Sequence, residues 1–182
     1  MSPGLDKRVV WITGLSGAGK SSLAHEVVLR LRAEGKAVVM LDGDELREVF
    51  GSASANVANH GRDARMMLAM QYARLCGMLA AQGLTVVIAT ISLFQEVHKW
   101  NRSNLPGYFE VYLNVPVDEL RRRDPKKIYR RFDAGALTDV AGLDLLIDEP
   151  DAADWVVDFE PNRSAAELAE DLFNRLNERE LP

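Results

Sequence analysis

The sequence GLSGAGKS, residues 14–21, matches the pattern GxxxxGK followed by Ser or Thr. It follows a short apolar run at 8–13, which predicts a buried strand, and it precedes residues 20–33, where apolar residues recur at helical spacing. A glycine-rich turn between a strand and a helix presents backbone N–H groups and the positive end of the helix to an anion. The segment therefore predicts a loop that binds nucleotide phosphates.

Two side chains of this loop have roles of their own in such a site. Lys20 supplies a mobile positive charge for the β- and γ-phosphates, and the Ser21 hydroxyl is a hard oxygen ligand for Mg²⁺. The loop does not by itself distinguish a kinase from an ATPase or a GTPase. The predicted phosphate-binding residues here are Gly14, Leu15, Ser16, Gly17, Ala18, Gly19, Lys20 and Ser21.

Strand-like and helix-like patterns alternate along the rest of the chain. The further strands are expected at 37–41, 84–91, 108–115 and 155–159, and helices at 44–50, 62–82, 93–103, from 117 and at 165–179. The strands are apolar on both faces, which is typical of parallel sheets covered by helices. We therefore expect a three-layer α/β/α fold with a mostly parallel five-stranded sheet in a single domain, residues 1–182. Ligands in such folds bind at the carboxyl ends of the strands.

Composition narrows the function classes. The chain has 182 residues and a formal net charge of −5, and no basic stripe favours nucleic-acid binding. No apolar run is long enough for a signal peptide or a membrane span, so we expect a cytoplasmic protein without a membrane partner. The single cysteine, Cys76, is expected to be a buried core thiol. His60 is interpreted as an ordinary loop histidine, with anion binding as the alternative, and His98 is interpreted in the same way.

A second motif, Asp42-Gly43-Asp44, follows the second predicted strand. Its carboxylates could organise Mg²⁺ and accept a proton from an attacking hydroxyl, whereas the alternative is a turn with Asp44 as a helix N-cap. Arg47 lies one helical turn further on, where it could meet an anionic acceptor. The base-reading motif NKxD of GTPases is absent from the sequence, which favours phosphate transfer to a small molecule.

Five blocks of sequence give the chain a family resemblance. It resembles the adenylyl-sulfate (APS) kinases over nearly its whole length. The resemblance implies an ATP- and Mg²⁺-dependent kinase that phosphorylates the 3′-hydroxyl of a nucleotide, nominally adenylyl sulfate, and that forms a homodimer. The blocks are GLSGAGKS at 14–21, LDGDELR at 41–47, ATISLF at 89–94, RDPKKIY at 123–129 and VAGLDLLIDEP at 140–150.

The resemblance also implies roles for particular residues. Lys20, Asp44 and Ser92 would be catalytic, and Ser92 matches a serine often assigned as a phosphoserine intermediate. Ser21 and Asp42 would hold the metal. A lid at about 123–150 would close over the phosphates, with Arg123 reaching ATP. The implied acceptor-binding residues are Asp42, Asp44, Arg47, Arg62, Arg65, Ile91, Ser92, Lys126 and Val140.

The chain departs from the family pattern on the acceptor side. Arg65 stands at an asparagine position, Met67 and Leu68 replace paired arginines, and Val140 replaces an aromatic residue. An aromatic lost from a base-stacking site removes about 1–3 kcal/mol per base. The sequence Trp-Asn-Arg at 100–102, with Gly-Arg at 61–62, resembles a subgroup of the family linked to bacterial surface polysaccharides. Together with the smaller Val140 and the altered acceptor helix, this makes a pyrimidine acceptor such as cytidine diphosphoramidate an alternative. A nucleotide-binding regulatory module without turnover is another.

Overall fold

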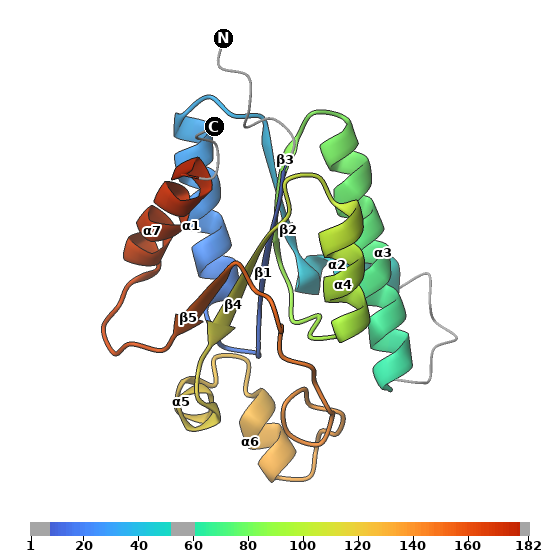
Figure 1. The fold of residues 1–182 in the computed structure, drawn as a ribbon. Coiled ribbons are helices and arrows are strands. Elements are labelled where there is room, and N and C mark those ends of the chain that lie inside the picture. Colours follow the sequence, from blue (N-terminus) through green and yellow to red (C-terminus); the bar gives the residue numbers. More distant parts are fainter. Residues whose placement is uncertain (1–7, 52–60, 179–182) are drawn as a thin grey trace.

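The computed structural model describes residues 8–51 and 61–178. Its sheet has the strand order β2-β3-β1-β4-β5, and all four pairings are parallel (Figure 1). The α/β fold with a five-stranded sheet is thus confirmed, and the sheet is parallel throughout. The strands are β1 Val9–Gly14, β2 Val38–Asp42, β3 Thr85–Ala89, β4 Phe109–Asn114 and β5 Trp155–Asp158.

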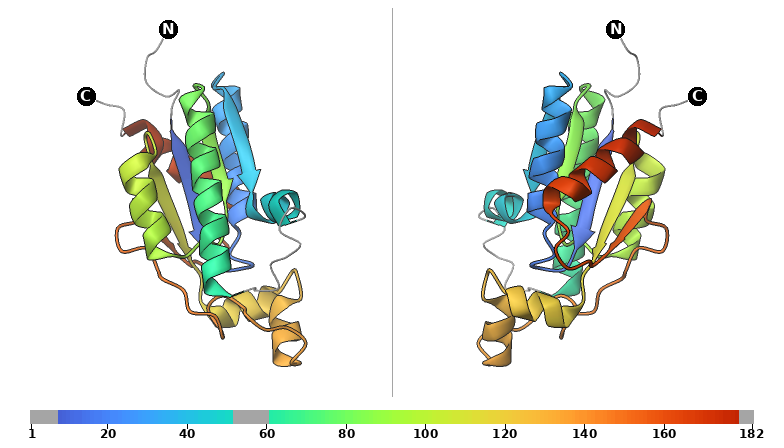
Figure 2. Two further views of the ribbon diagram at one scale, coloured as in Figure 1. Left: turned by 90° about the vertical axis from the view of Figure 1, so that its right-hand side faces the viewer. Right: turned by 90° about the vertical axis from the view of Figure 1, so that its left-hand side faces the viewer.

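Helices cover both faces of the sheet, which makes the three layers expected (Figures 1 and 2). One face carries α1 and α7, and the other carries α3 and α4, with α2 beside them at the β2 edge. None of the helices in residues 8–51 and 61–178 is both long and apolar enough to cross a membrane. The helices are α1 Lys20–Ala33, α2 Gly43–Gly51, α3 Arg62–Ala81, α4 Gln95–Asn104, α5 Val117–Arg123, α6 Ile128–Asp133 and α7 Ala165–Glu178.

The central strand β1 explains why the core has two halves. Successive side chains of a strand point to opposite faces. Val10 and Ile12 accordingly pack with α1 and α7, whereas Val9 and Trp11 pack with α3 and α4. All four are fully buried, so β1 is apolar on both faces because both faces are covered.

The strand order places a ligand site at the end of β1. From β1 the chain runs out to β2 and returns through β3, and it then crosses to β4 on the other side of β1. Such a change of direction opens a crevice at the carboxyl ends of the strands. Helices α5 and α6 lie at this same edge, at the bottom of Figure 1.

Three local expectations have different outcomes. Cys76 is buried in the core, as expected. The interpretation of His98 as a loop histidine is wrong: His98 lies in α4, within the helix expected at 93–103, and its side chain is buried. Helix α6 was not expected at all. The expected loop at 51–60 and the interpretation of His60 fall largely or wholly outside the described residues.

The packing of α7 against α1 gives a stability prediction. Leu172 in α7 is fully buried, so Leu172→Ala should leave a cavity and lower the free energy of unfolding by about 2–5 kcal/mol. The control is Leu29→Ala in α1, because Leu29 is 46% exposed and its loss should cost less than about 0.5 kcal/mol. Urea unfolding measures both. Equal losses would contradict the docking of α7 on the core.

Candidate functional site

The predicted phosphate loop lies between β1 and α1, at the carboxyl edge of the sheet. Gly14, Gly17 and Gly19 have positive φ angles of 148°, 82° and 97°, which favour glycine. A Cβ at Gly14 would lie 2.8 Å from the backbone oxygen of Leu113 in β4, so no side chain fits there. Helix α1 begins directly after the loop, so the positive end of its dipole would face an anion held in the loop.

Lys20 is the first residue of α1, and its side chain folds back over the loop. Its Nζ donates a hydrogen bond to the backbone oxygen of Leu15, at 2.7 Å. Burial and, next, the nearby charge of Lys126 lower the pKa of Lys20 to about 8, although Asp44 and Asp42 partly offset them. A phosphate entering the loop would stabilise the charged amine again.

Asp42 ends β2 next to the phosphate loop. The Ser21 hydroxyl donates to its Oδ2 at 2.5 Å, and the backbone N–H of Asp44 donates to its Oδ1 at 2.8 Å. Asp42 rather than Asp44 thus accepts the hydrogen bond at the start of α2, which corrects the N-cap alternative. A hydroxyl beside a carboxylate fits Mg²⁺, which usually takes one or two protein oxygens and otherwise water and substrate phosphates.

Asp44 lies between two cations. Its Oδ2 accepts a hydrogen bond from Lys126, and its Oδ1 lies 3.3 Å from the NH1 of Arg47. Burial acts to raise the pKa of Asp44, but its hydrogen bond with Lys126 and the charges of Lys126 and Arg47 lower it overall. Asp44 is therefore ionised at neutral pH, in the form that can accept a proton.

The segment that carries Lys126 is attached to the phosphate loop. The Tyr129 hydroxyl in α6 donates to the backbone oxygen of Ser16, at 3.0 Å. Asp124 accepts hydrogen bonds from the backbone N–H groups of Tyr129 and Arg130, at 3.2 and 3.0 Å, and so caps α6. These contacts bring Lys126 opposite Asp44.

One cavity of about 300 Å³ unites much of the predicted site. Three cations and two carboxylates border it, although the net charge of the whole chain is negative. The cavity thus supplies a local positive field for phosphates beside a candidate base. The predicted residues that line it are Ser16, Gly17, Gly19, Lys20, Ser21, Asp42, Asp44, Arg47, Ile91 and Lys126.

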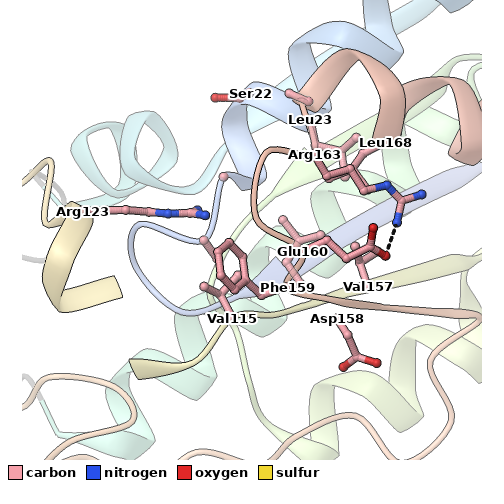
Figure 3. Close-up of a pocket in the computed structure, with 14 residues that line it drawn as sticks. Ser22, Leu23, Val115, Arg123, Val157, Asp158, Phe159, Glu160, Arg163 and Leu168 are labelled. Atoms are coloured by element: carbon pink, nitrogen blue, oxygen red, sulfur yellow. Dashed lines mark hydrogen bonds and ion pairs between the residues drawn. The ribbon is translucent and has the colours of Figure 1, made fainter. Parts of the chain in front are cut away.

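Figure 3 shows a second cavity, of about 210 Å³. Gly19 and Ser22 line both cavities. The guanidinium of Arg123 lies 5.0 Å from the ring centroid of Phe159, and its Nε donates to Glu119 at 2.7 Å. Arg163 and Glu160 form an ion pair of 3.1 Å on the opposite wall. A flat cation next to an aromatic ring suits a nucleobase, and Arg123 was predicted for ATP binding.

Ser92 lies in the turn that connects β3 to α4. It is buried, its φ is 31°, and its Oγ lies 2.8 Å from the Oγ1 of Thr90. Its backbone oxygen lies 3.0 Å from the Nε2 of His98. Ile91 and Thr90 line the first cavity, whereas Ser92 lies behind them.

Three further acceptor residues lie outside the linings of both cavities. Arg62 donates to Asp148 at 2.7 Å, and its guanidinium lies 5.1 Å from the centroid of Phe94. Arg65 is half-buried; burial and the charge of Arg47 lower its pKa. Val140 is buried. Gly14 and Leu15 of the loop also lie outside both linings.

The prediction missed several residues that line these cavities or support the phosphate loop. Thr90 directly precedes Ile91 in a block already quoted, so its position gave a usable signal. Phe159 follows the last strand, and the rule that ligands bind at strand ends could have found it. Tyr129 contacts the loop through tertiary structure alone, and the local sequence gives no sign of this.

Known proteins of one family match most of this chain. Residues 6–158 match the family model described as adenylylsulphate kinase. A cytidine diphosphoramidate kinase from Campylobacter jejuni is 32% identical over 168 residues, which cover 92% of this chain and 95% of that protein. An adenylyl-sulfate kinase from Deinococcus deserti is 36% identical over 147 residues, which cover 81% and 79%.

Solved structures give the same result. The Mycobacterium tuberculosis APS kinase, in complex with AMPPNP and APS, superposes with a TM-score of 0.85 at 30% identity. The superposition covers 96% of this chain and 99% of the other. The chain therefore belongs to the adenylyl-sulfate kinase family, and it is an ATP-dependent phosphotransferase.

Proposed function

We propose that this protein transfers the γ-phosphoryl group of ATP to the 3′-hydroxyl of a small nucleotide. The observation that carries the proposal is the cavity that Asp44 shares with Lys20 and Ser21. A substrate hydroxyl that enters this cavity beside the terminal phosphate would lie within reach of the Asp44 carboxylate. Positioning and electrostatic stabilisation account for most of the catalysis of phosphoryl transfer. The groups for the phosphate donor and the group for the hydroxyl acceptor border this one cavity.

The donor half binds ATP across both cavities. The backbone N–H groups of residues 14–19 and the Lys20 ammonium contact the phosphates, and the adenine lies in the second cavity near Arg123 and Phe159. Ser21 and Asp42 would hold Mg²⁺. When bound, the metal supplies positive charge that offsets the charge of the phosphate oxygens.

The acceptor half provides the base. As the 3′-oxygen forms its bond to the γ-phosphorus, its proton passes to Asp44, and the bond from the γ-phosphorus to the bridging oxygen breaks to release ADP. Asp44 first exchanges its ion pair with Lys126 for the substrate hydroxyl. The released Lys126 then pairs with phosphate oxygens.

Adenylyl sulfate is the first candidate acceptor, as the family suggests. A specific observation favours cytidine diphosphoramidate as the second. Val140 offers no aromatic face, and the ring of Phe94 is covered by the guanidinium of Arg62. These side chains would offer little stacking to a purine. The relative from Campylobacter jejuni that bears the name cytidine diphosphoramidate kinase supports this candidate.

Ser92 and the lid complete the proposal. Ser92 is buried and hydrogen-bonded to Thr90. We therefore propose that it stabilises the turn between β3 and α4 and does not carry a phosphate. We also propose that about residues 123–150 form a lid on a single domain, since Tyr129 and Lys126 link this segment to the site. The proposed assembly is a homodimer, which analytical ultracentrifugation tests.

The acceptor panel is the first test. ATP and Mg²⁺ are incubated with adenylyl sulfate, cytidine diphosphoramidate or unphosphorylated nucleosides, and ADP release is followed by a coupled assay. One of the two nucleotides should exceed the nucleosides at least about tenfold in kcat/KM, because charge-assisted hydrogen bonds hold its anionic group. ATP binding without acceptor-dependent ADP release would favour the regulatory module instead.

Lys20 gives a pH-dependent prediction. Its pKa is about 8 in the free protein and should rise when phosphates bind, so ATP binding at pH 8 should take up about half a proton. ATP affinity should therefore fall as the pH rises above 8. Calorimetry in buffers of different ionisation enthalpy measures the uptake.

Lys20→Ala should abolish this proton uptake and the transfer, and it should weaken ATP binding about 10- to 100-fold. The matched control is Lys99→Ala on the exposed side of α4, which should behave as wild type. Unchanged proton uptake in Lys20→Ala would show that another group titrates.

Asp44→Asn tests the base. The amide keeps the size of the side chain but cannot take the proton, so kcat should fall at least about 100-fold while the Kd for ATP stays close to that of wild type. Glu170→Gln in α7 is the control, because this carboxylate is exposed and lies outside both cavities. Full turnover by Asp44→Asn would show that the base is a different group.

A further inference from the structure

A cluster of polar side chains is buried between α4 and β4. Glu110 in β4 is 2% exposed, and its Oε1 accepts a hydrogen bond from the Tyr108 hydroxyl at 2.9 Å. That hydroxyl accepts one from the Nδ2 of Asn101 in α4, at 3.3 Å. Burying a carboxylate costs free energy unless neighbouring groups donate hydrogen bonds to it or balance its charge. The neighbours of Glu110 therefore decide how it is stabilised.

Arg102 closes the cluster toward solvent. Its NH2 donates to Glu110 at 3.4 Å, and its NH1 donates to Asp154 at 2.7 Å. Asp154 also accepts the backbone N–H of Glu110, at 2.7 Å. The negative charge of Glu110 is thereby partly balanced on one side, and His98 lies on the other, with its Nε2 3.9 Å from Oε1 of Glu110.

The contact of His98 with the turn at Ser92 determines which ring nitrogen of His98 carries the proton. Its Nε2 lies 3.0 Å from the backbone oxygen of Ser92, which can only accept, so Nε2 carries the hydrogen. The nearby carboxylate of Glu110 favours the proton on the same nitrogen. The Nδ1 has no hydrogen-bond partner among the described residues. His98 therefore has one hydrogen bond to make, and Ser92 receives it.

The Ser92 turn needs such a restraint. Its φ of 31° lies in a region that L-residues rarely adopt, and such backbone costs of order 1–3 kcal/mol unless its surroundings hold it. The oxygen of Ser92 also accepts the N–H of Phe94, at 3.1 Å, which closes the turn tightly. The turn directly follows Thr90 and Ile91, which line the first cavity.

We propose that His98 is a positioning residue for the acceptor. Its Nε2–H holds the strained Ser92 turn, and this fixes Thr90 and Ile91 on the wall where the acceptor binds; Glu110 keeps the proton on that nitrogen. This inference rests on the proposed function, because it assigns the first cavity to the acceptor. His98 acts through the backbone and touches no substrate.

The test compares three variants at one position. His98→Leu removes the donor; His98→Gln keeps a donor that can reach the Ser92 oxygen; His98→Asn keeps an amide that is too short. The control is His25→Leu, because His25 is an exposed histidine of α1. The readouts are kcat and KM for the acceptor, Kd for ATP, and hydrogen exchange of the Phe94 and Gln95 amides.

His98→Leu and His98→Asn should lower kcat/KM for the acceptor at least about tenfold, as expected for one lost buried hydrogen bond, with the Kd for ATP unchanged. The Phe94 and Gln95 amides should exchange faster, whereas the amides of residues 14–21 should not. His98→Gln should restore most of the kcat/KM for the acceptor and most of the protection of the two amides from exchange. If His98→Leu does not fold, the comparison of Asn with Gln decides.

The proposal is overturned if exchange in the Ser92 turn is the same in all variants, or if ATP binding weakens as much as acceptor use. The outcome remains distinct from that of the proposed function. If the wild-type protein turns over no nucleotide, the proposed function fails, and hydrogen exchange alone still decides whether His98 holds the turn.

Discussion

The close approach of β1 to β4 constrains the whole site. A side chain at position 14 would collide with the backbone oxygen of Leu113. Only glycine therefore fits at the end of β1, where the backbone turns into the phosphate loop. The loop in turn sets the start of α1 and the position of Lys20. A Cβ at Gly142 would lie 2.9 Å from Leu15, which means that the segment on the acceptor side rests against the same loop. Donor and acceptor sides therefore depend on one tight backbone path.

In the free protein, the functional groups of the site are held by other protein groups. Lys126 is held by Asp44, Ser21 by Asp42, and Lys20 by a backbone oxygen. Ion pairs that are about half exposed, as Lys126 and Asp44 are, contribute only about 0–1 kcal/mol. Substrates can therefore displace them at low cost, and the same groups then serve the phosphates, the metal and the acceptor hydroxyl. A chain of net negative charge binds polyanions through such local placement.

The sequence was sufficient for features that depend on neighbouring residues and insufficient for those that depend on distant ones. The phosphate loop, the Asp42–Asp44 motif and the five strands could be predicted because each is a contiguous pattern. Helix α6 has six residues, too few for periodicity, and it depends on Asp124 and Tyr129. The pairing of Arg123 with Phe159 and the burial of His98 arise from segments that only the fold brings together.

The central claim is that one cavity joins the phosphate donor to the hydroxyl acceptor beside Asp44. It is tested most directly by locating the transferred group: a single turnover with [γ-³²P]ATP and a nucleotide acceptor, followed by chromatography of the labelled product beside standards phosphorylated at known positions. Our account predicts a phosphate monoester on the 3′-oxygen of the acceptor and one equivalent of ADP. Label that appears only as inorganic phosphate, or on a different atom of the acceptor, would contradict it.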